Sequence, residues 1–442
     1  MAKIGFISLG CAKNQVDCER MMFRVQEAGH SVEAELVNTD VVVINTCGFI
    51  DSAASEAIDN ILQTARLKEA GLVGKILVTG CLSQRYQEEI LKEMPEVDGI
   101  LGTGSYTEIV PAIERLLENE QVIDFGDIDA PEVETGRILT TPEHYAYLKI
   151  AEGCDNKCAY CVIPSLRGKF RSRHLDDVLY EARVLAHEGV KEMIVVAQDT
   201  SRYGTDLGDG KRLLPQLLKE LCAIEDLHWV RLHYVYPDEI DEELIDVIAS
   251  EPKIVKYLDI PIQHCNSEIL ERMNRRGNGE YLRWLLTHLR EKIPGLVLRS
   301  SIITGLPGEG DEEFTELCQF LKDMRMERVG AFPFSPQEGS EAAKMEYPDF
   351  GVAQKRAQII EELQSRIMDD WNDSMVGKDL EVLVDGYDEE MGQYYGRSYA
   401  DSPDVDGRVW IACDEPLREG NFVMVHIDGS AEGELTGYLL EE

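Results

Sequence analysis

The length, charge and hydropathy of this chain exclude several classes of protein. Its 442 residues carry 83 acidic and 44 basic side chains, a net charge of −39. Such an excess of acid repels phosphate backbones and suits a basic protein partner, although it also serves solubility alone. No apolar run approaches the ~18 residues that span a bilayer. The apolar run at the start of the chain is too short for a secretory signal. We therefore expect a cytoplasmic protein without a membrane partner, long enough for about three domains.

The N-terminal part alternates between apolar strands and helices. In order, the predicted elements are a strand at 3–9, a helix at 16–28, a strand at 41–46, a helix at 52–68 and a strand at 75–79. Continuous apolar strands that alternate with helices are typical of a parallel, doubly wound sheet.

Three cysteines follow these three strands by one or two residues. Cys11, Cys47 and Cys81 each have a glycine beside them, which permits close approach of the backbone. Loops after the carboxyl ends of parallel strands meet at one edge of the sheet, where ligands bind. A buried structural thiol is the ordinary role of a single cysteine, and we assign it to Cys18. For three cysteines at equivalent strand ends, the sequence instead predicts a shared cluster site.

The remaining chain divides into a linker and two further domains. Residues 124–142 combine acids, prolines and glycine without periodicity, which is typical of a linker. We accordingly predict an N-terminal domain at 1–125, a linker at 126–143, a central domain at 144–374 and a C-terminal domain at 375–442. The chain has eleven cysteines, and in a cytosolic protein these favour metal binding or catalysis over disulfides.

The central domain has six strand candidates separated by helices. The strands are predicted at 145–151, 192–198, 229–234, 257–260, 296–303 and 328–334, and a long charged helix at 352–370 closes the domain. Without a Rossmann glycine fingerprint, such units predict a partial, TIM-like (β/α)6 barrel with its chemistry at the carboxyl ends of the strands. The polar residues expected on that rim are Gln198, Asp199, Gln263, His264, Thr304 and Gly305. Phe332 and Phe334 are interpreted as core.

A second group of cysteines, Cys154, Cys158 and Cys161, follows the first of these strands at spacing C-x3-C-x2-C. Iron–sulfur cubes normally take four thiolates, so three local cysteines leave one iron free to bind a substrate or cofactor. A zinc knuckle that lacks a ligand, or three buried thiols, are the alternatives; no Cys or His pair follows at zinc-finger spacing. With Tyr160 before the last cysteine, the motif resembles the signature of the radical S-adenosylmethionine superfamily, in which the open iron binds S-adenosylmethionine.

The C-terminal part has short strands at 380–385, 394–398, 409–411 and 422–427, separated by Asp, Gly and Pro. This pattern predicts a small antiparallel barrel. Residues 375–442 contain 4 basic and 17 acidic side chains, so we predict no direct grip on RNA by this domain. Asp401, Asp404 and Asp406 are expected to belong to an acidic surface that steers a basic protein.

The order of these motifs resembles the methylthiotransferase family over essentially the full length. The matching stretches are Ser8-Leu-Gly-Cys-Ala-Lys-Asn-Gln-Val-Asp17, Asn45-Thr-Cys47, Gly80-Cys81 and Ser300-Ser-Ile-Ile-Thr-Gly-Leu-Pro-Gly-Glu309. Members of this family carry an N-terminal three-cysteine domain, a radical S-adenosylmethionine core and a C-terminal TRAM β-barrel. The stretches Cys47-Gly-Phe-Ile-Asp-Ser-Ala, Arg231-Leu-His-Tyr-Val-Tyr-Pro237 and Tyr257-Leu-Asp-Ile-Pro-Ile-Gln-His264 are most similar to its ribosomal-protein branch, the RimO type.

The resemblance implies two 4Fe-4S clusters and S-adenosylmethionine as cofactors. The cluster on Cys154, Cys158 and Cys161 makes an adenosyl radical, and the cluster on Cys11, Cys47 and Cys81 carries or donates sulfur. Residues implied in cofactor binding are Gln198, Asp199, Arg299, Ser300 and Gly305, for which helix capping, a structural ion pair or a turn are the alternatives. No residue is assigned as acid or base. A flavodoxin- or ferredoxin-like electron donor is implied as a partner.

The implied substrate is an aspartate of a basic small-subunit ribosomal protein at the decoding centre, whose β-carbon receives a methylthio group. The rival branch of the family modifies adenosine in transfer RNA. A non-catalytic iron–sulfur scaffold or electron carrier is the alternative from another class. Two open three-cysteine sites argue against a carrier, because carriers usually saturate their clusters with four ligands.

Overall fold

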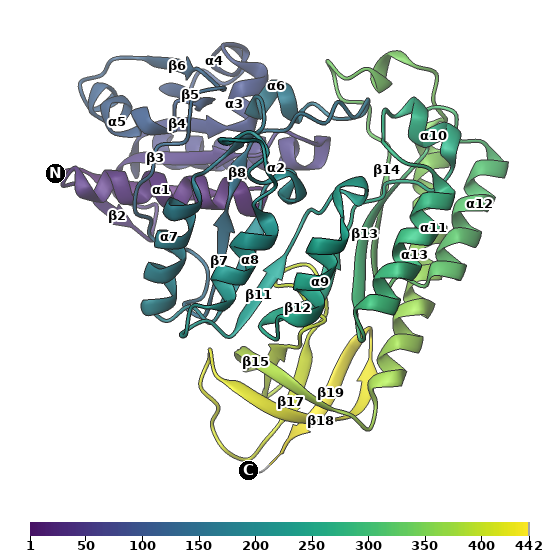
Figure 1. Cartoon of the computed structure of the whole chain (residues 1–442). Coiled ribbons are helices and arrows are strands. Elements are labelled where there is room, and N and C mark those ends of the chain that lie inside the picture. Colours follow the sequence, from purple (N-terminus) through teal and green to yellow (C-terminus); the bar gives the residue numbers. More distant parts are fainter. Residues whose placement is uncertain (441–442) are drawn as a thin grey trace.

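Three folded bodies follow one another along the chain in the computed structural model, which describes residues 1–440 (Figure 1). An N-terminal α/β domain lies beside a central partial barrel, and a small closed barrel lies below the central one. The predicted multidomain α/β class and the order of its parts are confirmed. No helix in this described stretch is long and apolar enough to cross a membrane.

The N-terminal domain is a parallel sheet with helices on both faces. Its strands are β1 (Lys3–Ser8), β2 (Ser31–Glu33), β3 (Thr39–Thr46), β4 (Val73–Gly80), β5 (Gly99–Gly104) and β6 (Val122–Gly126). Its helices are α1 (Ala12–Glu27), α2 (Asp51–Glu69), α3 (Cys81–Tyr86), α4 (Glu89–Glu93) and α5 (Ile109–Leu117). The strand order is β2-β1-β3-β4-β5-β6. Helices α1 and α5 pack on one face and α2, α3 and α4 on the other, so the doubly wound sheet is confirmed.

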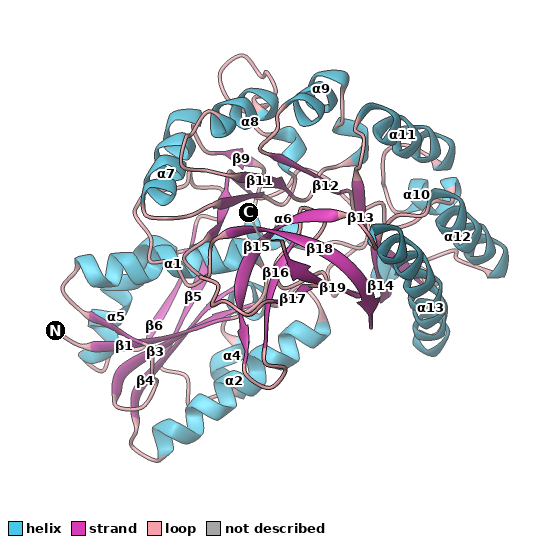
Figure 2. Ribbon diagram, turned by 90° about the horizontal axis from the view of Figure 1, so that it is seen from below, coloured by secondary structure: helices cyan, strands magenta, loops and turns pink. Residues whose placement is uncertain are grey.

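The central domain is a six-stranded parallel sheet, curved into a partial barrel. Its strands are β7 (Tyr145–Lys149), β10 (Glu192–Val196), β11 (Trp229–Leu232), β12 (Ile254–Asp259), β13 (Val297–Thr304) and β14 (Arg328–Pro333), in the order β14-β13-β12-β11-β10-β7. A short pair, β8 (Ala151–Glu152) and β9 (Arg171–Ser172), flanks the cysteine loop. The helices are α6 (Ile163–Arg167), α7 (Leu175–His187), α8 (Leu214–Cys222), α9 (Glu242–Ser250), α10 (Ser267–Arg272), α11 (Gly279–Lys292), α12 (Asp311–Met324) and α13 (Phe350–Met375). Seen from below, the larger helices form an arc outside the sheet (Figure 2).

The C-terminal domain is a closed five-stranded barrel. Its strands are β15 (Asp379–Asp388), β16 (Gln393–Arg397), β17 (Val409–Ala412), β18 (Phe422–Ala431) and β19 (Glu434–Leu439). The sequence did not predict β19. The pairing is antiparallel except between β17 and β19, which run parallel.

Residues 127–144 contain no helix or strand, and they bind both neighbouring domains through ion pairs. Arg20 of α1 meets Glu132 at 2.7 Å, and Arg173 of the central domain meets Glu134 at 2.5 Å. Gly136 lies against the ring of Phe23, where an added Cβ would come within 2.6 Å of the ring. The segment therefore fastens the two domains together rather than separating them.

A segment of the C-terminal barrel, 398–408, enters the central barrel at the amino ends of its strands. The residues of the central strands that contact this segment face into the barrel. They alternate along the strands with residues such as Val230 and Leu258, which pack under the outer helices. The contacts are Arg231 to the Tyr399 carbonyl at 2.9 Å, Arg328 to Asp401 at 3.0 Å, Ser402 with His233 at 3.1 Å, and Tyr257 to Asp406 at 2.6 Å.

This insertion corrects one prediction. Asp401 is 2% exposed, and the Asp406 side chain is 5% exposed and also lies 3.9 Å from Arg299. Both carboxylates fill the barrel and pair with its cations, so they do not belong to an acidic outer surface. Of the three predicted surface residues, only Asp404 is exposed.

Candidate functional site

The three N-terminal cysteines are brought together by the loops after β1, β3 and β4. Cys11 precedes α1, and Cys81 is the first residue of α3. A Cβ added at Gly10 would lie 2.6 Å from the Cβ of Cys47, and one at Gly48 would lie 2.7 Å from the Cα of Leu82. The three loops therefore touch at one edge of the sheet, and they can do so because glycine stands at each crossing.

Arg167 of α6 reaches this edge from the central domain. Its Nε donates to the Sγ of Cys81 at 3.3 Å, and its other nitrogens donate to Asn14 at 2.8 Å and Asp17 at 2.6 Å. Burial raises the pKa of the Cys81 thiol to about 11, against the opposing charge of Arg167. Loss of solvation would by itself raise the pKa of the Cys11 thiol as well. The positive charges of Lys13 and Arg167 outweigh that effect and hold the pKa of Cys11 below its usual value.

The central cysteines lie in the loop between β8 and α6. The Cys154 amide donates to the Gly168 carbonyl at 3.1 Å, and the Cys161 amide donates to the Cys158 carbonyl at 3.0 Å. The Sγ of Cys158 meets the Tyr236 hydroxyl at 3.2 Å, and the guanidinium of Arg275 lies 3.9 Å away. Burial raises the pKa of Cys154 to about 11 and of Cys161 to about 12, so both thiols are protonated at neutral pH without a metal.

The two cysteine sites adjoin each other. Val162, which follows Cys161, and Leu166 of α6 pack against Cys81 and Phe49 of the N-terminal domain. The helix α6 therefore connects the sites directly: its beginning adjoins one cysteine loop, and Arg167 at its end hydrogen-bonds a cysteine of the other.

The donors at both sites fit an iron–sulfur cluster. Each site offers three thiols, and buried Arg or Tyr groups contact one sulfur at each site, Cys81 and Cys158, as partners of cluster ligands do. Across residues 1–440 no group of three or more His, Cys, Asp or Glu side chains converges closely enough to hold a single metal ion. Iron–sulfur clusters are held mainly by cysteine thiolates, and each site supplies three cysteines.

Two of the predicted cofactor residues lie beside the central cysteine loop. The Nε2 of Gln198 donates to Glu152 at 2.5 Å, while its Oε1 is buried and has no hydrogen-bond partner among the described residues. Asp199 accepts a bond from Asn156 of the cysteine loop at 2.7 Å and another from Ser201. Burial raises the pKa of Asp199, against the effect of these two bonds.

The other three predicted residues are occupied by structural contacts. Arg299 pairs with Asp259 at 3.1 Å, and the Ser300 hydroxyl donates to the Ile260 carbonyl at 2.8 Å. Gly305 faces α13, where an added Cβ would lie 2.4 Å from the Cβ of Ala353. In this arrangement the three residues join strand to strand and sheet to helix.

An apolar pocket of about 480 Å³ lies where the N-terminal domain meets the ends of β13 and β14. The residues that line it include Phe49, Ile50, Tyr160, Gln263, Ser301, Ile303, Phe332, Phe334 and Phe350. Phe334 is buried, as expected of a core residue, but Phe332 is 49% exposed and belongs to the pocket wall instead. Ser301 and Ile303 are two residues apart on β13, so both side chains point to the face that lines this pocket.

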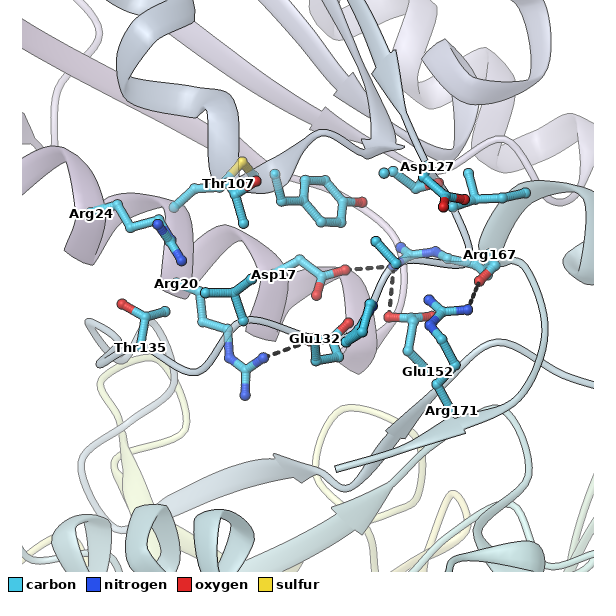
Figure 3. A pocket seen from close by; sticks show the side chains of 18 residues that line it. Asp17, Arg20, Arg24, Thr107, Asp127, Glu132, Thr135, Glu152, Arg167 and Arg171 are labelled. Atoms are coloured by element: carbon cyan, nitrogen blue, oxygen red, sulfur yellow. Dashed lines mark hydrogen bonds and ion pairs between the residues drawn. The ribbon is translucent and has the colours of Figure 1, made fainter. Parts of the chain in front are cut away.

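A second cavity, of about 110 Å³, lies between α1, the segment 127–135 and α6 (Figure 3). Charged side chains on its walls pair with one another: Arg167 bonds Asp17 and Glu152, and the buried Lys149 meets the same two carboxylates at 2.5 and 2.9 Å. Sequence reasoning missed this cluster, because its members come from three separate segments.

Three stretches of the chain match known protein families. Residues 3–102 match "Uncharacterized protein family UPF0004", residues 148–321 match the radical SAM superfamily, and residues 376–440 match the TRAM domain. Among solved structures, the radical S-adenosylmethionine methyltransferase TsrM from Kitasatospora setae aligns with a TM-score of 0.56 at 14% identity, covering 75% of this chain and 73% of that one. At this identity the likeness concerns the fold alone.

Curated relatives match from end to end. The ribosomal protein uS12 methylthiotransferase RimO of Thermoanaerobacter sp. (strain X514) is 46% identical over 440 residues, 99% of this chain and 100% of the relative. RimO of Clostridioides difficile (strain 630) is 42% identical over 444 residues, covering 100% of both chains. With such identity over three domains in the same order, this chain belongs to the RimO family of radical S-adenosylmethionine methylthiotransferases, enzymes that use S-adenosylmethionine and 4Fe-4S clusters.

Proposed function

We propose that this protein attaches a methylthio group to the β-carbon of an aspartate in the small-subunit ribosomal protein uS12. The observation that carries the proposal is the contact between the two three-cysteine loops through Val162, Leu166 and Arg167. A reaction that makes a carbon radical at one site and supplies sulfur from another requires adjacent sites. An electron carrier has no need of two sites that each lack a fourth ligand.

We assign one cluster to Cys154, Cys158 and Cys161 and the other to Cys11, Cys47 and Cys81. When bound, these groups supply adenosyl-radical formation and sulfur, and S-adenosylmethionine also supplies the methyl group. The chain itself holds the two sites together and surrounds them with protein. Arg275 and Arg167 place a positive charge beside one sulfur at each site, which favours the thiolate that a cluster requires.

For S-adenosylmethionine we propose a position that runs from Gln198 to the apolar pocket. The unpartnered Oε1 of Gln198 is suited to accept a bond from the methionyl ammonium, and Asp199 lies next to it. The pocket beside Tyr160 has the apolar walls and the few polar groups, Gln263 and Ser301, that a nucleoside requires. Arg299, Ser300 and Gly305 act through the packing of the strands behind this position.

The partners follow from charge and chemistry. A basic ribosomal protein complements a chain with a net charge of −39, whereas transfer RNA would be repelled by it. A flavodoxin- or ferredoxin-like protein supplies the electron, and the reaction takes place in the cytoplasm, where ribosomes are found. The names of the curated relatives favour this branch over the transfer RNA branch.

The test is anaerobic reconstitution, followed by separate incubation with small ribosomal subunits and with transfer RNA and mass spectrometry of both. We expect a methylthio group on the ribosomal protein alone. Modified transfer RNA with unmodified uS12 would overturn the proposal.

Two variants test the assignment of the cysteines. Cys158→Ala should abolish 5′-deoxyadenosine formation. The triple alanine variant of Cys11, Cys47 and Cys81 should keep about four irons and still cleave S-adenosylmethionine, without inserting sulfur. A native enzyme that never forms 5′-deoxyadenosine would support the electron carrier instead.

A further inference from the structure

Lys13, at the start of α1, is a buried cation without an acidic partner. Lys13 is 8% exposed, and no carboxylate within residues 1–440 lies within 4.0 Å of its ammonium group. The first turn of α1 also contains no acidic residue. Burying an unpaired charge is costly, and a cation at a helix N-terminus opposes the helix dipole. The chain has 83 acidic side chains, yet none of them within the described residues pairs with Lys13.

The ammonium group of Lys13 lies across the domain boundary, 3.6 Å from the ring centroid of Tyr234 in the central domain. Tyr234 has an uncommon left-handed backbone, with φ at 58°, and three bonds hold it there. Its amide donates to Asp259 at 3.3 Å, and its carbonyl accepts from the amide and hydroxyl of Thr200 at 3.1 and 3.0 Å. The ring is thus a fixed platform for the cation.

This pair stands between the two cysteine sites. Lys13 is two residues from Cys11, and Tyr234 is two residues from Tyr236, whose hydroxyl meets the Sγ of Cys158 at 3.2 Å. Tyr234 packs with apolar residues on the inner face of the central barrel, including Ile194 and Val196. A substrate that is activated at one site and receives a group from the other must lie near both, and this cation adjoins residues of both.

From this geometry we propose that Lys13 binds the carboxylate of the substrate aspartate and so selects an acidic side chain over a neutral one. The inference rests on the proposed function, which makes the substrate an aspartate. The carboxylate carbon is bonded directly to the β-carbon, so holding the carboxylate fixes the reacting carbon one bond away. Lys13 is a specificity-determining residue in this scheme.

The neighbouring cations have other partners. Arg167 bonds Asp17 and Glu152, Arg275 bonds the Pro261 carbonyl, and Arg299 bonds Asp259. A cluster on Cys11 is the rival counter-ion for Lys13. However, Arg167 and Arg275 donate directly to cysteine sulfurs, whereas the ammonium of Lys13 lies over an aromatic ring.

The experiment compares enzyme and substrate variants in a double-mutant cycle. Reconstituted enzyme with S-adenosylmethionine but no reductant is titrated with small ribosomal subunits that carry either aspartate or asparagine at the target position. We expect Lys13→Met to weaken binding of the aspartate subunits about tenfold or more and to leave the asparagine subunits unaffected. Lys13→Arg should retain most of the preference. Lys3→Met, which removes an exposed lysine of the same domain, is the matched control and should behave as the native enzyme.

Three outcomes separate the possibilities. Equal weakening for both kinds of subunit, or none for either, would overturn the role of Lys13 while leaving the proposed function intact. Loss of iron from Lys13→Met with an unchanged preference for aspartate would assign the lysine to the cluster instead. Native enzyme that binds neither kind of subunit would overturn the proposed function together with this inference.

Discussion

Cys11 and Cys81, which we assign to one cluster, have thiols of opposite character. Cys11 is exposed, and two nearby cations lower its pKa, whereas Cys81 is buried and its pKa rises to about 11. Because the thiolate is the reactive form of cysteine, this difference controls how the two thiols respond to pH once iron has been removed.

In protein stripped of iron, we expect iodoacetamide to modify Cys11 first at neutral pH. A lowered pKa keeps its thiolate populated there, while Cys81 and Cys154, with pKa values of about 11, should react only as the pH rises toward that value. Peptide mass spectrometry of timed samples gives each rate, and Cys11→Ser should remove the fast phase alone. Equal rates for Cys11 and Cys81 at neutral pH would contradict the assignment.

At this scale the sequence predicted the cysteines but not the charges around them. Spacing and position after strands singled out six cysteines, which lie in two adjoining sets of loops, and their role as cluster ligands stays a prediction. Arg167 and Asp17 lie 150 residues apart, and Lys149 and Asp17 lie 132 apart, so no local pattern could pair them. Arg299 and Ser300 are the third and fourth residues of β13, nearer its amino end than its carboxyl end, and the periodicity of the strand could not say which side chains were already engaged by neighbouring strands.

Among the secondary-structure elements, the loops after β1, β3 and β4 depend on glycine for their contact. Gly10 and Gly29 make a matched pair, since both have a left-handed backbone, with φ at 92° and 86°. Gly10 lies against Cys47, whereas an added Cβ at Gly29 would have nothing within 4 Å. Any difference between alanine variants at these positions therefore measures the crowding at the cysteine loops.

We expect Gly29→Ala to lower the free energy of unfolding by about 1 kcal/mol, which is the cost of a left-handed alanine. Gly10→Ala should cost about 1–3 kcal/mol more, because its Cβ would meet the Cβ of Cys47 at 2.6 Å. Urea denaturation measures both values, and the iron content after reconstitution should fall for Gly10→Ala alone. Similar losses for the two variants would show that the loops are not closely packed.

There are physical reasons why the sequence did not predict some helices and strands correctly. The helix α1 begins at Ala12 rather than near residue 16, because its first turn is polar and gives no apolar period. The strand β5 contains Gly99, Gly102 and Gly104, which hide a strand pattern. The linker was identified from composition alone, and composition cannot reveal that Glu132 and Glu134 bind arginines of two domains.

For the molecule as a whole, the segment 398–408 fixes the C-terminal barrel to the central one. Motif order was enough to predict three domains, but not how the third one docks, because its buried pairs join residues far apart in sequence. The domain boundaries at 125, 143 and 374 stay predictions.

Asp401→Ala should loosen this docking, because it leaves Arg328 buried without its carboxylate, at a cost of about 3–5 kcal/mol. Hydrogen exchange across 398–408 should rise, and exchange in the N-terminal sheet should not. Asp414→Ala, which removes an exposed carboxylate of the same domain, is the control and should leave exchange unchanged. Equal protection in the two variants would contradict the insertion.

We expect the acidic charge of the C-terminal domain to increase the rate of association with the ribosome. A test of this effect must use residues that face solvent. Glu389, Glu390 and Glu415 are exposed on this domain and form no ion pair within the described residues. Reversal of all three to lysine should slow association with the basic ribosomal protein and flatten its salt dependence, because steering acts on the encounter.

The dissociation rate should change little, since exposed charges at a rim contribute little once the complex has formed. The matched control reverses three exposed acids of the N-terminal domain, Glu69, Glu93 and Glu118, which changes the net charge by the same amount. Stopped-flow association at several salt concentrations compares the two. If steering depends on the C-terminal barrel, only the first variant slows. Equal slowing would assign the effect to the net charge of −39, and no slowing in either would mean that the acids serve solubility alone.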